Sequence, residues 1–155
     1  MADPHKDISS KSKQNISAYD AANTEFNLAV QLPLELDGVD GYTAIKNYRD
    51  LAMQNLKMLV LTAPGEKMMD PEFGVGLRNF LFEQNHVSSH GEIEARIYNQ
   101  VQTYLPYIDI LRVDFSTTTD EHPEPYSSNL VHIVVSFHIK PLDIYEVLDL
   151  SVSRN

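Results

Sequence analysis

The chain has 155 residues, no cysteine and a formal net charge of −10, from 22 acidic and 12 basic residues. Its length and its 43% hydrophobic content are typical of one domain with a real core, and without cysteine it has neither disulfides nor cysteine-bound metal. The acidic balance argues against a general nucleic-acid binder, and no run approaches the roughly 20 apolar residues that a membrane span needs.

The chain begins with a polar segment over residues 1–23, rich in Ser, Lys, Asp and Asn, which we interpret as an extension before a domain over residues 24–155. This segment has no apolar run, so no signal peptide is expected. A period of two then predicts a strand with one buried face, and Pro33 either ends this strand or marks it as an edge strand. The apolar residues of this strand are Phe26, Leu28, Val30 and Leu32.

Two long helices are predicted by apolar residues that recur every three or four positions. The first covers about residues 43–61, and its apolar positions are Ile45, Tyr48, Ala52, Leu56 and Leu59. The second begins at a capping-box pattern, in which Ser89 precedes Glu92 by three residues, and it ends at Pro106. Its buried row is expected to contain Ile93, Ile97, Val101 and Leu105.

Between the helices, residues 58–85 concentrate turn-forming residues between two apolar anchors. A Pro-Gly pair at residues 64–65 breaks the first helix, and a short extended piece follows over residues 66–69. An Asp-Pro pair at residues 70–71 then starts a second turn, because proline keeps the residue before it out of the helical region. So much turn chemistry predicts a fixed corner that displays polar groups on a rigid base.

Two glycines complete this corner, because Gly74 and Gly76 allow a tight backbone path that other residues resist. They lead into a short helix whose apolar side contains Leu77, Phe80 and Leu81. We expect Gly74 to have an unusual backbone conformation, which a β-branched residue would tolerate poorly.

The remainder of the chain predicts sheet. One strand precedes a polar loop over residues 116–129, and its apolar face is expected to contain Leu111, Val113 and Phe115. The most regular alternation in the chain predicts a second strand through Val131, Ile133, Val135, Phe137 and Ile139. A turn at residues 140–143 leads to a last strand over residues 144–152. Its apolar residues Leu148, Leu150 and Val152 are expected on one face, outside the main helical core.

The order of these elements indicates a single α+β domain. Two main helices and a short one would pack on a largely antiparallel sheet, behind the polar N-terminal extension. The simplest interpretation of the net charge of −10 is a solvated surface. In the alternative interpretation, the acidic surface is complementary to a basic protein partner.

The acidic residues near the corner are the first candidates for catalysis, since a glycosidase works with two carboxylates. They are Glu66, Asp70, Glu72 and Glu83. A glycosidase also needs an acid in an apolar pocket, whereas these residues stand on predicted turns, and the chain has no tryptophan to stack on a sugar. Asp70 is explained as a turn initiator before Pro71. We therefore expect no catalytic residue and no enzyme.

Metal and cofactor sites are not expected either. His132 and His138 are six residues apart on one predicted strand, too far to chelate one ion within the strand. His86 and His90 flank a predicted helix start. The glycines at positions 74 and 76 lack the preceding strand and the spacing of a phosphate-binding loop.

The corner resembles the signature of the small baseplate wedge proteins of contractile-tailed phages. This family includes the initiators of the tail sheath and their relatives in type VI secretion and other contractile injection systems. The matching residues are Thr62, Pro64, Gly65, Glu66, Lys67, Pro71, Phe73, Gly74, Leu77, Leu81, Phe82 and Glu83. Lys67 stands where arginine is more usual, which keeps the charge but loses the planar fork. The likeness extends over residues 40–153.

This resemblance implies a structural component of a tail baseplate in the virion, assembled in the host cytoplasm. The implied partners are the larger wedge proteins, the tail sheath protein, and tail tube or hub proteins, with about six copies in a ring that partners hold together. A baseplate subunit of a type VI or other injection system is the alternative. A peptidoglycan glycosidase is the enzymatic alternative, because relatives have been labelled tail lysozymes.

The resemblance also implies two contact sites. The wedge-partner site would be the corner, through Glu66, Lys67, Pro71, Phe73, Arg78 and Glu83. Arg78 has two interpretations that stay open here: a surface ion pair worth ~0–1 kcal/mol, or a charged contact to a neighbouring wedge protein. The sheath-docking strand would contain Ile144, Val147, Leu148, Leu150 and Val152. The unpaired N–H and C=O groups of an edge strand invite an added strand.

Overall fold

The computed structural model describes residues 26–36, 38, 41–80, 87–116 and 130–153, which form three α-helices and five strands. The helices are α3 (Tyr48–Leu61), α4 (Leu77–Phe80) and α5 (Val87–Tyr104). The strands are β1 (Ala29–Val30), β2 (Ala44–Ile45), β3 (Ile108–Ser116), β4 (Leu130–Ile139) and β5 (Ile144–Ser153). Within these ranges, no helix combines the length and the apolar character that crossing a bilayer requires.

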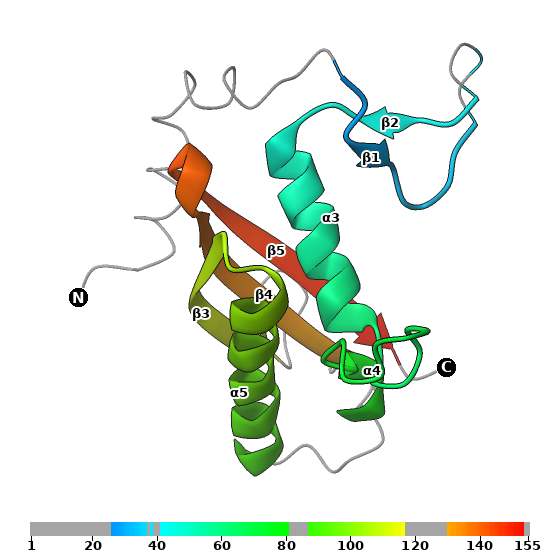
Figure 1. The fold of residues 1–155 in the computed structure, drawn as a ribbon. Helices are drawn as coiled ribbons and strands as arrows, with labels where there is room; N and C mark the ends of the chain where they lie inside the picture. Colours follow the sequence, from blue (N-terminus) through cyan, green and yellow to red (C-terminus); the bar gives the residue numbers. More distant parts are fainter. Residues whose placement is uncertain (1–25, 37, 39–40, 81–86, 117–129, 154–155) are drawn as a thin grey trace.

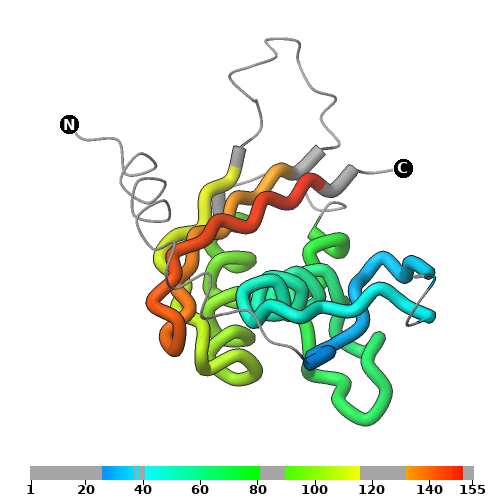
Figure 2. The backbone as a smooth tube through the Cα atoms, turned by 90° about the horizontal axis from the view of Figure 1, so that it is seen from above, coloured from blue at the N-terminus to red at the C-terminus, as the bar shows by residue number. Residues whose placement is uncertain are grey.

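Strands β3, β4 and β5 form one antiparallel sheet in that order, with β4 in the centre and β5 at an edge. The 3₁₀ helix η1 (Lys140–Leu142) and Asp143, in the left-handed region at φ 51°, make the tight connection from β4 to β5. Figure 2 shows α3 and α5 on one face of this sheet. The predicted α+β class, with helices packed on an antiparallel sheet, is confirmed.

The core lies between the sheet and the two long helices. Every second residue of β4 faces the helices and is buried: Ile133, Val135, Phe137 and Ile139. The predicted row on α5 is also buried, from Ile93 to Val101, and Leu105 follows it just before Pro106. α3 contributes Ala52, Leu56, Leu59 and Val60. The two periodicities of the sequence therefore predicted this core correctly.

The segment before α3 differs from the prediction. The predicted strand over residues 26–32 is reduced to β1, and three of its four expected core residues, Phe26, Val30 and Leu32, are exposed. Its partner β2 occupies the first residues of the predicted helix. The helix begins only at Tyr48 because the side chain of Asn47 caps it, accepting a hydrogen bond of 2.8 Å from the backbone N–H of Arg49. Figure 1 shows β1 and β2 on the far side of α3 from the sheet.

Three further expectations were wrong in detail. Residues 66–69 form consecutive turns instead of an extended piece, with Met69 at φ 69°. Helix α5 begins at Val87, so the capping-box serine lies inside its first turn. A bulge at Leu111 shifts the register of β3 against β4, which leaves Leu111 exposed and buries Val113. The proposed domain boundary at residue 24 and most of the predicted loop over 116–129 lie outside the described residues.

Candidate functional site

The corner is built by the chain folding back onto the end of α3. Its turns occupy residues 62–76, and α4 follows with Arg78. The backbone N–H of Val75 donates to the carbonyl of Leu59 at 3.0 Å, and that of Gly76 donates to the carbonyl of Thr62 at 2.8 Å. Carbonyls in the last turn of a helix have no partner within the helix, so these two bonds satisfy groups that would otherwise need water. The corner is therefore attached to α3 through the backbone.

This close approach requires glycine at position 74. Gly74 has φ +107°, and a Cβ there would lie 2.2 Å from the carbonyl oxygen of Thr62. Gly76 has φ +73°, and its Cβ would lie 2.9 Å from Cδ of Pro64. The expected unusual conformation of Gly74 is confirmed. Both its positive φ and the close contact with the Thr62 backbone exclude a larger residue at this position.

Helix α5 holds the corner from the other side. The amide of Gln100 spans two backbone groups, because its Oε1 accepts from the N–H of Gly74 at 2.9 Å and its Nε2 donates to the carbonyl of Glu72 at 3.0 Å. Phe73 packs edge-on against Tyr104, with ring centroids 4.9 Å apart. These contacts fix the second half of the corner on a rigid helix.

A charged pair closes this face of the corner. The hydroxyl of Tyr104 donates to Asp70 Oδ1 at 2.9 Å, and Lys67 Nζ lies 3.3 Å from Asp70 Oδ2. Lys67 Nζ also lies 4.0 Å from the centroid of the Phe73 ring, a cation–π contact. The pKa of Tyr104 is raised, and the largest cause is its hydrogen bond to Asp70. Desolvation and the charges of Asp70 and Glu72 raise the pKa further.

Of the residues predicted to bind the wedge, Lys67 and Phe73 are therefore engaged inside the corner. Glu66 and Arg78 both line a hollow of about 370 Å³, together with Leu61 of α3 and Leu32. Glu66 Oε2 accepts from the N–H of Ala63 at 2.8 Å, and no ion pair joins Glu66 to Arg78. The remaining two predicted residues are Pro71, which is exposed, and Glu83, which lies outside the described residues.

The carboxylates of the corner have structural partners. Both oxygens of Asp70 are engaged, as described above, and Glu66 caps a backbone N–H. Glu72 is exposed on a turn. A glycosidase acid needs an apolar pocket, and none of these three carboxylates occupies one. In the part of the chain that the structure describes, no three acidic or histidine side chains gather in a way that could hold a metal ion.

The predicted docking strand, β5, is part of the core on one face. Ile144, Leu148 and Leu150 are at most 5% exposed and face the helices, so the expectation that this face lies outside the helical core was wrong. Val147, on the opposite face, is 37% exposed. The side chain of Val152 lies outside the described residues. No strand among the described residues pairs with the outer edge of β5.

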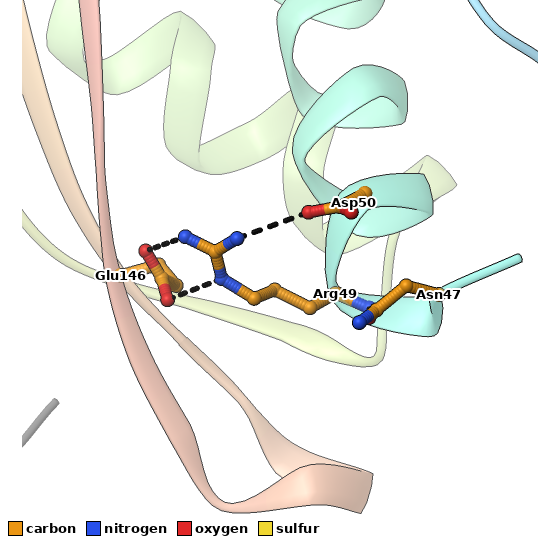
Figure 3. A network of polar contacts seen from close by, with 4 residues as sticks. All are labelled: Asn47, Arg49, Asp50 and Glu146. Carbon is orange, nitrogen blue, oxygen red and sulfur yellow. Dashed lines mark hydrogen bonds and ion pairs between the residues drawn. The ribbon is translucent and has the colours of Figure 1, made fainter. Parts of the chain in front are cut away.

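An ion pair that was not predicted from the sequence holds β5 to α3. Arg49 binds Glu146 through two hydrogen bonds, Nε to Oε1 at 2.5 Å and a second nitrogen to Oε2 at 3.0 Å (Figure 3). Arg49 also reaches Asp50 at 3.0 Å. Glu146 is only 8% exposed, so its charge needs this partner. A signal was present in the sequence, because Glu146 is the one charged residue among the buried alternating positions of the strand.

The sequence of this chain is similar to those of known proteins. The model of the family described as "Baseplate wedge protein gp25" matches residues 46–141, which is more than half of the chain and includes the corner. The chain belongs to this family. Baseplate wedge protein gp25 of Enterobacteria phage T4 is 29% identical over 103 residues, which cover 64% of this chain and 74% of that protein.

Two solved structures have the same fold. A putative tail lysozyme from Geobacter sulfurreducens superposes with a TM-score of 0.59 at 18% identity, over 73% of this chain and 96% of that one. A chain of the anti-feeding prophage baseplate also gives a TM-score of 0.59, at 20% identity, over 72% of this chain and 84% of that one. These identities show the fold alone.

Membership of the baseplate wedge family settles the general role. The protein is a structural component of a contractile tail baseplate, it contacts other baseplate components, and it is not an enzyme. The lysozyme name belongs to a distant neighbour that shares the fold.

Proposed function

We propose that this baseplate wedge protein has two docking sites, the corner for larger wedge proteins and the outer edge of β5 for a strand of the first sheath ring. The protein would be assembled in the host cytoplasm, with about six copies around the tail tube, as the resemblance to baseplate wedge proteins implies. A subunit of a type VI or other injection system is the alternative. Capsid and tail genes beside its own gene would favour the phage.

The wedge-facing proposal is supported by the rigidity of the corner. Its backbone is attached to α3, and Gln100 and Tyr104 of α5 hold it from the other side. A surface that is already ordered loses little conformational entropy on binding, so more of its contact energy appears as affinity. Glu66 and Arg78 at the hollow offer charges of both signs to a partner.

The sheath-facing proposal rests mainly on one observation: β5 is an edge strand whose inner face is fixed. Its apolar residues pack under the helices, and Glu146 binds Arg49. The strand is thus held in place, and no strand among the described residues pairs with its outer edge, which is the geometry that β-augmentation uses. Each added main-chain hydrogen bond is worth about 0.5–1.5 kcal/mol net, and a ring of copies presents many such edges together.

The burial of β5 excludes truncation as a test of this proposal. Deleting residues 144–155 would remove buried Ile144, Leu148 and Leu150 and leave Arg49 without Glu146. We therefore expect the truncated chain to unfold, so a missing sheath would say nothing about docking.

Cross-linking through side chains that the core does not use is a sharper experiment. A photoreactive residue replaces Val147 on β5, and a matched variant carries it at Leu111, which is 45% exposed on β3 at the opposite edge of the sheet. In assembling tails, we expect the Val147 variant to cross-link to the sheath protein and the Leu111 variant not to. If Val147 yields no sheath adduct while both variants enter baseplates, docking at the β5 edge is wrong.

A further inference from the structure

Two methionines form the tip of the corner. Met68 is 88% exposed and Met69 is 102% exposed, the highest values of any large apolar side chain in the described residues. Neither packs against the core. Exposed apolar side chains are common singly, but two adjacent methionines at the end of a projecting turn form an apolar patch that water solvates poorly.

The backbone that carries this tip is closed at its base and strained at its end. The N–H of Gly65 donates to the carbonyl of Pro71 at 2.9 Å, which closes the loop, and the Lys67–Asp70 pair spans the tip at 3.3 Å. Met69 has φ 69°, in the left-handed region that asparagine and glycine occupy more readily. Strain of this kind persists where surrounding structure imposes it, and it is concentrated at functional sites.

Folding alone does not explain methionine at these two positions. A turn with φ > 0 favours glycine or asparagine, and an exposed position favours a polar side chain. Methionine is, however, well suited to fill an apolar pocket on a partner, because its unbranched side chain adapts to irregular shapes. The corner's own rigid parts would hold the pair in position for such a contact.

The charges around the tip indicate the chemistry of the partner. Within residues 66–72, the carboxylates of Glu66, Asp70 and Glu72 outnumber the single ammonium group of Lys67, which pairs with Asp70. The segment that carries the two methionines is therefore net acidic, in a chain with a net charge of −10. A complementary surface has an apolar socket with basic residues around it.

We propose that Met68 and Met69 insert together into an apolar socket with a basic rim on another protein of the baseplate. This inference rests on the proposed wedge-facing role of the corner and names the residues that anchor it. It differs from the prediction based on Lys67 and Phe73, since those side chains contact α5 and each other.

Methionine oxidation tests this contact without changing the sequence. Dilute peroxide converts an accessible methionine to its sulfoxide, and peptide mass spectrometry gives the rate at each position. In the free chain, Met68 and Met69 should oxidise rapidly and the partly buried Met53 slowly. In isolated baseplates, we expect oxidation of the tip pair to slow by about tenfold or more, relative to Met53.

Three outcomes would overturn the proposal. Oxidation of Met68 and Met69 at the free rate, in baseplates that contain the chain, would refute the socket while the wedge-facing role remains. Absence of the chain from baseplates would refute the proposed function itself. Protection that appears in the free chain as its concentration rises would assign the tip to contact between copies.

A variant pair tests whether the side chains anchor the assembly. Met69→Gly removes a side chain and suits the observed φ, and Met68→Gln keeps the length of the side chain but makes it polar. In the double variant, we expect incorporation into baseplates to fall by about tenfold with no decrease in Tm, whereas the control Leu111→Gln on β3 should incorporate normally. Normal incorporation of the double variant, or a lowered Tm that accounts for its loss, would contradict an anchoring role.

Discussion

The corner and the segment before α3 are held to the molecule in opposite ways. We call the described residues of 26–45, which carry β1 and β2, the arm. The corner is attached through backbone hydrogen bonds to α3 and side-chain bonds from α5, and its apolar exposure is confined mainly to its tip. The arm is attached mostly by pairing with itself, and its exposed apolar residues are Phe26, Val30, Leu32, Leu34, Leu36 and Tyr42.

A side chain of α3 attaches the arm to the helices. Gln54 of α3 accepts from the N–H of Leu32 at 2.8 Å and donates to the carbonyl of Val30 at 3.0 Å. Both bonds are exposed to water, and two-stranded pairs are marginal by themselves. The comparison indicates a corner that unfolds with the whole domain and an arm that opens locally at much lower free energy.

Matched glycine substitutions should show the largest difference between the two regions. At Gly74, Ala adds a Cβ 2.2 Å from a backbone oxygen, and at Gly41, in the arm, it meets nothing within 4 Å although φ is +86°. We expect Gly74→Ala to lower the free energy of unfolding by at least about 3 kcal/mol and Gly41→Ala by about 1 kcal/mol. Urea denaturation measures both values, and equal losses would contradict the comparison.

The Tyr104–Asp70 hydrogen bond should make the free energy of unfolding depend on pH in the alkaline range. The pKa of Tyr104 is raised in the fold because Asp70 accepts from its hydroxyl, so the folded state holds this proton more tightly than the unfolded state. The stabilisation is fully present below the unfolded pKa near 10 and is lost as pH rises through the higher folded pKa.

Substitution of Tyr104 by Phe tests this pH dependence. We expect Tyr104→Phe to lower the free energy of unfolding by less than Gly74→Ala does, and to flatten its decline above pH 10. Denaturation of both proteins between pH 8 and pH 11 measures the difference. Parallel pH curves for wild type and Tyr104→Phe would show that the hydrogen bond contributes nothing to the pH dependence.

The corner was predictable from sequence because its turns need particular residue types, namely proline and glycine. Pro and Gly pairs restrict or widen the allowed φ locally, so the turns and the special role of Gly74 followed without knowledge of the fold. The alternating core strand β4 and the row of apolar residues on α5 were predictable for a similar reason, since each period places one face in the core.

The arm, the bulge and the contacts of Lys67 depend on tertiary structure. Alternation from Phe26 to Leu32 is typical of a half-buried strand, but no second layer of described residues covers it, and Phe26, Val30 and Leu32 are exposed. The bulge at Leu111 depends on the register of β3 against β4, which no local pattern encodes. The role of Lys67 in binding a partner stays a prediction, and its contacts with Phe73 and Asp70 within the corner were not predicted.

A single substitution on α3 should loosen the attachment of the arm. Gln54→Ala removes both side-chain bonds to the arm and leaves the backbone of α3 intact, so we expect a loss of about 0.5–1 kcal/mol in global stability. Hydrogen exchange should accelerate at the amides of Leu28, Gln31 and Leu32, with no change in the corner. Gln102→Ala, at an exposed position of α5, is the matched control and should leave exchange in the arm unchanged.

The smallest effect is expected for an apolar residue of the arm itself. Leu36 is 83% exposed, so Leu36→Ala removes few contacts and should change the free energy of unfolding by less than about 0.5 kcal/mol. Leu77, where the corner enters α4, is fully buried, and Leu77→Ala should cost about 2–5 kcal/mol. The same chemical change should thus cost several times more stability at Leu77 than at Leu36, and thermal denaturation of both variants measures the difference. A loss at Leu36 comparable to that at Leu77 would mean that the arm packs on the domain in solution, and its apolar residues would then belong to the core.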